Sequence, residues 1–514
     1  MKQWMLLCML AAFVVCAGGC GTERGDSGPV HGSQIVCATS EYEEINPLTD
    51  EYSGAALLLF DGLMRRDGTG AVVPGLAASY EYDPETYTYV FHLRDGVVWH
   101  DGKPLRAADV KFTIDAVQNP LVRASNKLNF EDVREVTEID ERTVRIRLSA
   151  PNAAFLDHML QPILPAHLLA GRDLMATGFF HSPVGTGPYR MESWEAGRRL
   201  TLVRNENYYR GAPKIEHFVF KFLPDEETEV GILEKGGLNL ANLSPKNAAL
   251  FANRDGFRRY AMKSADYAAI LVNRTHPYWQ KNSDLLPAIA YAIDRQKVID
   301  EALMGTGMPA YGPLQRNVYN NPDVPHYDYD PAKARELLVS AGCTLGSDGY
   351  YMRDGEEVGF VLTLRNDQYS RLDIANTVAA QLCEVGIHCT VETPAKVDRD
   401  GQMAYLSRAG SALDADVHTY KTFRTDGSAN DGHYSNPRVD AYLLAARRTL
   451  DPAERRRLYG LFQEEVARDL PYVFICYIDR NIVTSTRVHG ITEDLVLGHR
   501  GAGMFWNVHE WTVD

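Results

Sequence analysis

Segments typical of strands alternate with segments typical of helices along this whole chain, and that alternation most constrains its fold. Residues 87–93 and 143–148 alternate along their length and are rich in β-forming side chains, so they predict strands. Residues 285–304 and 452–469 predict helices, the second with its Arg455–Arg457 run on a solvated face. The pattern predicts an α/β protein. A chain of 514 residues is too long for one ordinary core, so two or three lobes are expected.

The first twenty residues have the layout of a secretory signal peptide, predicted over residues 1–19. Lys2 precedes an apolar run from Met5 to Val15 that is too short to span a membrane comfortably. Small residues then lead to Cys20, which resembles the cleavage site of a bacterial lipoprotein and implies lipidation there. Residues 20–33 are polar and rich in glycine, as a flexible tether would be. The chain is therefore expected to work outside the cytoplasm, anchored to a membrane through lipid.

Charge and missing motifs exclude several classes of function. The net charge of −15 argues against nucleic acid as a partner. The sequence has no GxSxG, HExxH or GxxxxGK[ST] pattern and no CxxC pair, so we expect neither an enzyme nor a cofactor. Among the cysteines after Cys20, Cys383 and Cys389 are close enough to form a disulfide. They also fit small buried apolar residues.

Several long motifs resemble one protein family. The strongest runs from Tyr89 to Thr113 and reads YVFHLRDGVVWHDGKPLRAADVKFT. Further motifs are PVGTGPY at 183–189, RNENYYRGAPK at 204–214 and YSNPRVD at 434–440. Together they resemble the extracellular solute-binding proteins that serve peptide and nickel ABC importers. Most of these residues are expected to build the scaffold and not to touch a ligand.

The resemblance implies a two-lobed fold of the periplasmic-binding-protein type (class II-like, cluster C), with a ligand cleft between the lobes and an extra subdomain. A monomer that closes about a hinge is expected. The implied division is 34–57, 181–268 and 480–514 for the first lobe, 58–180 for the subdomain and 269–479 for the second lobe.

The resemblance also implies ligand-binding residues. Peptide-binding members hold the ligand's ammonium group with an aspartate of the second lobe, which follows a tryptophan. Asp426 and Phe423 fall at these two places, although Asp426 also fits a turn residue before Gly427. The remaining predicted ligand-binding residues are Tyr420 and Arg424 on the same segment, and Tyr42, Asn46 and Tyr52 in the loop after the first strand.

Two alternatives stay open beside a receptor for oligopeptides or dipeptides that works with an ABC permease and ATPase. The nickel-binding branch holds a metal chelate, and residues 421–423 resemble its Arg-Thr-Trp. His433 or His418 would then be the metal ligand, although lone histidines are weak evidence. A ligand sensor that is not coupled to import would use the same cleft.

Overall fold

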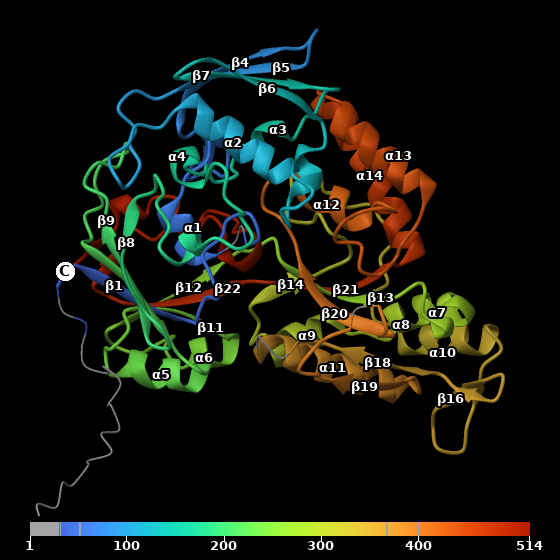
Figure 1. Cartoon of the computed structure of the whole chain (residues 1–514). Coiled ribbons are helices and arrows are strands. Elements are labelled where there is room, and N and C mark those ends of the chain that lie inside the picture. Colours follow the sequence, from blue (N-terminus) through green and yellow to red (C-terminus); the bar gives the residue numbers. More distant parts are fainter. Residues whose placement is uncertain (1–29, 31, 51–52, 366–368, 399) are drawn as a thin grey trace, which may run out of the picture.

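The computed structural model describes residues 30, 32–50, 53–365, 369–398 and 400–514. Cys20, Tyr52 and the predicted signal peptide lie outside these residues. Figure 1 shows mixed helices and sheets in two lobes, which confirms the predicted α/β, two-lobed class.

Two sheets build the first lobe. One has the order β1-β10-β9-β8, with β1 parallel to β10, and the other has the order β11-β22-β12. Helices α5 and α6 cover their lower side in Figure 1. The elements are β1 (Gln34–Thr39), α1 (Gly54–Leu59), β8 (Tyr189–Glu195), β9 (Arg199–Arg204), β10 (His217–Phe222), α5 (Glu226–Glu234), β11 (Leu240–Leu243), α6 (Pro245–Ala249), β12 (Phe257–Met262), β22 (Arg480–Ser485), β23 (Val488–His489) and β24 (Thr512–Val513).

The subdomain is an antiparallel sheet of order β4-β5-β7-β6 with α2 packed on it. The predicted strands at 87–93 and 143–148 are confirmed as β5 and β7. Its core is continuous with that of the first lobe, through residues such as Phe91 and Trp99. The elements are β2 (Met64–Arg66), β3 (Val72–Pro74), β4 (Ala77–Asp83), β5 (Thr88–Leu93), α2 (Ala107–Gln118), β6 (Val133–Asp140), β7 (Thr143–Leu148), α3 (Phe155–His158) and α4 (Ala166–Leu169).

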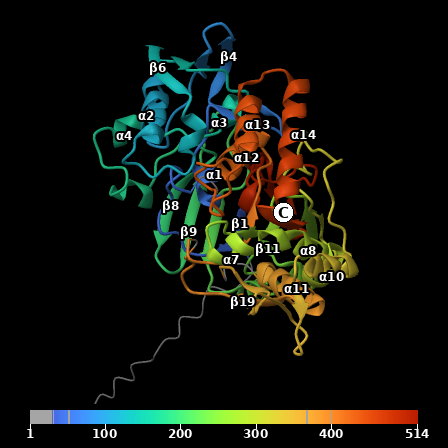
Figure 2. The ribbon, with the colours of Figure 1, turned by 90° about the vertical axis from the view of Figure 1, so that its right-hand side faces the viewer.

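The second lobe is built on a six-stranded sheet of order β14-β21-β13-β20-β18-β19. Figure 2 shows α7, α8, α10 and α11 gathered at its lower end, whereas α13 and α14 rise toward the subdomain. The elements are β13 (Tyr267–Val272), α7 (Pro277–Asn282), α8 (Leu286–Tyr291), α9 (Arg295–Ala302), β14 (Gly307–Pro309), α10 (Pro331–Ser340), β15 (Thr344–Leu345), β16 (Tyr351–Arg353), β17 (Glu356–Glu357), β18 (Gly359–Thr363), α11 (Tyr369–Val385), β19 (His388–Glu392), β20 (Ala404–Ala409), α12 (Ala415–Phe423), α13 (Pro437–Arg448), α14 (Pro452–Asp469) and β21 (Tyr472–Ile478).

Two predicted helices and one candidate cysteine pair of this lobe can be compared with the structure. The helix predicted at 285–304 is two helices, because Asp294 caps α9 by accepting from the Lys297 amide and so starts a new axis. The helix at 452–469 is confirmed as α14, but its Arg455 is buried and ion-paired with Asp414. The solvated face predicted for the arginine run was therefore wrong at Arg455. Cys383 and Cys389 form no disulfide.

Gly185 lies in the motif at 183–189, and the backbone of Leu59 packs closely against it. A Cβ at this position would lie 1.8 Å from the Leu59 carbonyl oxygen. His100 fixes the segment, since its Nδ1 accepts from the Gly185 amide at 3.1 Å and its Nε2 donates to the Gly187 carbonyl at 3.1 Å. Burial lowers the pKa of His100 to about 4, which keeps the ring neutral in these two roles.

We therefore expect Gly185→Ala to lower the free energy of unfolding by about 3 kcal/mol or more, because backbone must move to admit the methyl group. Urea unfolding followed by circular dichroism measures this loss. Gly231→Ala is the matched control: Gly231 lies in α5 with open space around it, so alanine should be neutral or slightly stabilising. Equal midpoints for the two variants would contradict the packing argument.

Candidate functional site

A cavity of about 200 Å³ lies where the two lobes and the subdomain meet. The first lobe and subdomain supply most of its wall. Ser411, Leu413 and Val417 supply the side that belongs to the second lobe. The polar and charged residues of the wall include Asp61, Arg65, Arg66, Asn126, Asp157, His158, Gln161, Arg210, His499 and His509. A cavity shared by both lobes is the place where a ligand could hold them together.

Positive charge gathers on one side of the cavity. Arg65 lies on β2, and burial beside Arg210 lowers its pKa. Arg65 makes no ion pair with any residue that the structure describes, and its Nη1 donates to the Arg66 carbonyl at 3.3 Å. Burial raises the pKa of Asp61 to about 7 against the opposing effect of Arg210, so this carboxyl is only partly ionised at neutral pH. The wall therefore favours a negatively charged group in the ligand.

Neutral polar groups complete the wall. Asn126 donates to Gln161 Oε1 at 2.5 Å, which orients both amides. Burial lowers the pKa of His509 to about 4, and burial with Arg447 nearby holds the pKa of His158 well below its usual value. Both imidazoles are therefore neutral at pH 7. Asp157 differs, because burial and the facing Asp414 raise its pKa to about 7.

The predicted residues of the second lobe lie beside the cavity and not in its wall. Phe423 is fully buried in the core of the lobe. Tyr420 is buried and its hydroxyl donates to Glu131 of the subdomain at 2.6 Å. Arg424 pairs with Asp426 at 2.7 Å, and the Asp426 side chain is 72% exposed. The ammonium-binding role of Asp426 stays a prediction.

The predicted residues of the first lobe serve the scaffold in this conformation. Tyr42 packs edge-on against Trp194, Phe220 and Phe222. Asn46 is buried, donates to Glu44 at 3.0 Å and accepts from the Leu48 amide at 3.1 Å. Their role in ligand binding also stays a prediction.

The two histidines proposed as metal ligands lie apart. His418 is buried and bonded to the Tyr267 hydroxyl at 2.8 Å, whereas His433 is partly exposed near Asp400. Within the described ranges no cluster of three or more histidine, cysteine, aspartate or glutamate side chains could hold a metal ion.

Sequence reasoning missed Arg65, Arg210 and Asp61. Arg210 lies in the segment 204–214, which was assigned to the scaffold, whereas Asp61 and Arg65 follow α1 and lie in none of the motifs. The signal that could have found them is charge. Two adjacent arginines, Arg65 and Arg66, on a short strand after a buried helix are unusual for a scaffold.

Comparisons with known proteins agree with this architecture. Residues 71–430 match the family described as bacterial extracellular solute-binding proteins, family 5. Protein XP55 of Streptomyces lividans is 32% identical, over 94% of this chain and 91% of its own. The glutathione-binding protein GsiB of Pectobacterium atrosepticum is 29% identical, over 86% and 88%.

Solved structures match over nearly the whole chain. NikZ from Campylobacter jejuni, in complex with Ni(L-His), superposes with a TM-score of 0.88 at 31% identity, covering 95% of this chain and 99% of its own. AppA from Bacillus subtilis, in complex with a nonapeptide, has a TM-score of 0.82 at 22% identity, with 95% and 100% covered, and shows the fold alone. No helix in the described part of the chain is long and apolar enough to cross a membrane. The chain therefore belongs to family 5 of the bacterial extracellular solute-binding proteins, the ligand-capturing components of ABC importers, which act outside the cytoplasm.

Proposed function

We propose that this protein captures short peptides in the cavity between its lobes and delivers them to the permease and ATPase of an ABC importer. The observation that carries the proposal is the Arg65–Arg210 side of the cavity, where neither guanidinium forms a direct ion pair with a described residue and both can meet a ligand's carboxylate. Arginine suits this role because its planar fork can bind a carboxylate through two parallel hydrogen bonds.

The charged groups of the wall favour a zwitterionic ligand such as a peptide with free ends. The partly ionised Asp61 lies among the arginines and gives a zwitterionic ligand a second charged partner.

Arg65→Gln should weaken the binding of a dipeptide about 10- to 100-fold, because a charge-assisted bond to the carboxylate is lost. Isothermal titration of the dipeptide and of its C-terminal amide measures this effect, and the amide should lose much less. Asp426→Asn is the companion variant: if Asp426 binds the ammonium group, it should weaken free-amino peptides more than N-acetylated ones. A dipeptide that binds Arg65→Gln as tightly as the unmodified protein would exclude Arg65 as the carboxylate anchor.

We further propose that Cys20 carries the lipid that anchors the protein, and that the chain acts as a monomer. Mass spectrometry of the N-terminal peptide from membrane-extracted protein tests the anchor. A diacylglycerol-modified Cys20 is expected, and an unmodified Cys20 would refute it.

A metal–amino-acid chelate is the second candidate. The likeness to the Ni(L-His) complex of NikZ favours it, together with three histidines in the cavity wall, His158, His499 and His509. Neither ring nitrogen of His158 has a hydrogen-bond partner among the described residues. Since the protein side offers few metal ligands, the chelator would have to supply most of them.

Native mass spectrometry of the purified protein with its co-purified ligand separates the two candidates. Masses of di- or tripeptides are expected. A nickel adduct with an amino acid would move the assignment to the chelate. If no ligand is retained, thermal-shift assays with dipeptides and with Ni(II)–L-histidine decide, because a true ligand raises the melting temperature.

A further inference from the structure

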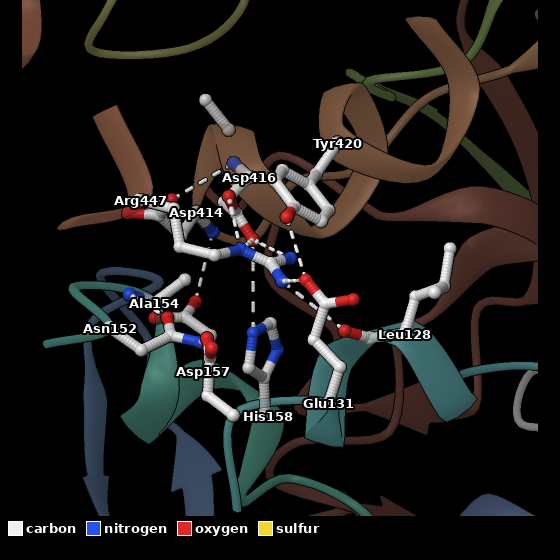
Figure 3. Close-up of polar contacts among 12 residues, drawn as sticks. Leu128, Glu131, Asn152, Ala154, Asp157, His158, Asp414, Asp416, Tyr420 and Arg447 are labelled. Atoms are coloured by element: carbon white, nitrogen blue, oxygen red, sulfur yellow. Dashed lines mark hydrogen bonds and ion pairs between the residues drawn. The ribbon is translucent and has the colours of Figure 1, made fainter. Parts of the chain in front are cut away.

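The second lobe docks on the subdomain through a buried polar contact next to the cavity. Helices α12 and α13 approach α3 and the segment before β6 (Figures 1 and 3). We name this contact the Arg447 clasp. Its members are Asp416, Tyr420, Arg447 and Arg448 of the second lobe, and Glu131 and Asp132 of the subdomain.

Arg447 is the centre of the clasp. Its side chain is fully buried and pairs with Asp416 of its own lobe at 2.6 Å. Across the interface, Nη1 donates to Glu131 Oε1 at 2.9 Å and to the Leu128 carbonyl at 3.2 Å. Figure 3 shows the guanidinium between these carboxylates and beside the ring of Tyr420, 3.2 Å from its centroid. Each charge is met by an opposite charge, as a buried ion network requires.

Further bonds tie the same two surfaces. The Tyr420 hydroxyl donates to Glu131 at 2.6 Å, which gives that carboxylate a partner on each helix. Arg448 pairs with the buried Asp132 at 2.6 Å and donates to the Pro151 carbonyl at 3.0 Å. The Ala153 amide donates to the Arg447 carbonyl at 2.8 Å, so backbone as well as side chains is engaged.

The clasp lies beside the cavity without entering it. Val417 and Asn129 line the cavity, one and two residues from clasp members Asp416 and Glu131, yet none of the described residues in the wall belongs to the clasp. A ligand would reach these groups only through His158 of the wall, whose Nε2 lies 3.8 Å from Asp416 Oδ2. The contact joins protein to protein whatever the cavity contains.

We propose that the Arg447 clasp holds the two lobes together independently of the ligand, so that it sets the affinity for every ligand by one common factor and leaves specificity to the cavity wall. The reason is that measured affinity scales with the fraction of molecules in the closed, binding-competent state. Contacts made without ligand raise that fraction equally for all ligands.

Glu131→Gln tests the proposal because it removes one of the two subdomain carboxylates of the clasp while Asp416 still pairs with Arg447. Small-angle X-ray scattering of the protein without ligand should show a larger radius of gyration than that of the unmodified protein. Glu135→Gln is the matched control, since Glu135 pairs with Arg147 inside the subdomain. Arg448→Gln removes a second bond across the interface and should also increase the radius of gyration. With two independent variants, the test still works if one of them fails to fold.

The affinity readout rests on the proposed function and is kept separate from the scattering readout. Glu131→Gln should weaken a dipeptide and Ni(II)–L-histidine, whichever binds, by the same factor of about ten. An unchanged radius of gyration in both Glu131→Gln and Arg448→Gln would overturn the clasp. A loss of affinity for only one of the two ligands would show that Glu131 takes part in ligand recognition. That result would also overturn the clasp. If neither probe binds, the proposed ligand class fails and scattering alone decides the clasp.

Discussion

Asp266→Asn should lower the free energy of unfolding by about 3–5 kcal/mol, the usual cost of removing one partner from a buried ion pair. Asp266 is fully buried where the chain passes from β12 to β13, beside the return from β21 to β22. Its carboxylate accepts from His499 at 2.8 Å and from Arg408 and Arg480 at 3.2 Å. Asparagine would leave the guanidinium groups of Arg408 and Arg480 facing each other without the central charge.

The environment of Asp266 explains the size of this effect. Burial alone would raise its pKa, but His499, Arg408 and Arg480 hold the pKa well below its usual value. A carboxyl with a depressed pKa stabilises the fold above its unfolded-state pKa of about 4, and this stability is lost only as the pH falls toward the folded value. The charge is therefore fully present at neutral pH.

Urea unfolding at pH 7 measures the loss. Asp115→Asn is the matched control, because Asp115 forms an exposed pair with Lys111 and should contribute less than about 1 kcal/mol. Similar midpoints for the two variants would show that the arginines at Asp266 are stabilised in another way.

The fold could be predicted from the sequence where local patterns decide it. The strand at 143–148 needs only alternation, and α14 needs only its apolar spacing with Asp451 and Pro452 at its start. The same helix shows the limit of such patterns. Arg455 fits a solvated face by type, yet it is buried because Asp414, 41 residues earlier, meets it there.

The site could be predicted only as a region. The resemblance directed attention to residues 416–430, but of these only Val417 lines the cavity, together with Ser411 and Leu413 just before that region. Which turn of α12 faces the cavity depends on how Arg447 docks on the subdomain. Arg447 lies 31 residues after its partner Asp416 on α12. No local motif contains that information. Arg65 and Arg210 are likewise far apart in sequence and meet only through the tertiary fold.

Ligand affinity should rise as the pH falls from 8 to 5, through Asp157. This residue of α3 accepts from the Asp414 amide at 2.9 Å across the interface between subdomain and second lobe. Burial and the facing Asp414 carboxylate together raise the pKa of Asp157 to about 7, against the opposing effect of Arg66 and Arg455. Opening of the lobes would return Asp157 to water and to a pKa of about 4.

The sign follows from the proton count. Between pH 4 and pH 7 the closed state binds one more proton than the open state, so protonation favours closure. The effect is at most about tenfold per pH unit, it is limited by the fraction of ligand-free molecules that are open, and it levels off above pH 7. Above that pH the Asp157 charge in the closed state must face Asp414, and closure is weakest.

Titrations of the identified ligand between pH 5 and pH 8 measure this dependence. Asp157→Asn keeps an oxygen that can accept from the Asp414 amide but binds no proton, so its affinity should change much less with pH. Asp61 also has a raised pKa, but its partners Arg210, Tyr208 and Arg65 all lie in the first lobe and subdomain and move with it. If the pH profile is unchanged in Asp157→Asn, the proton is taken up by Asp61 in the cavity wall and not by Asp157 at the interface between the lobes.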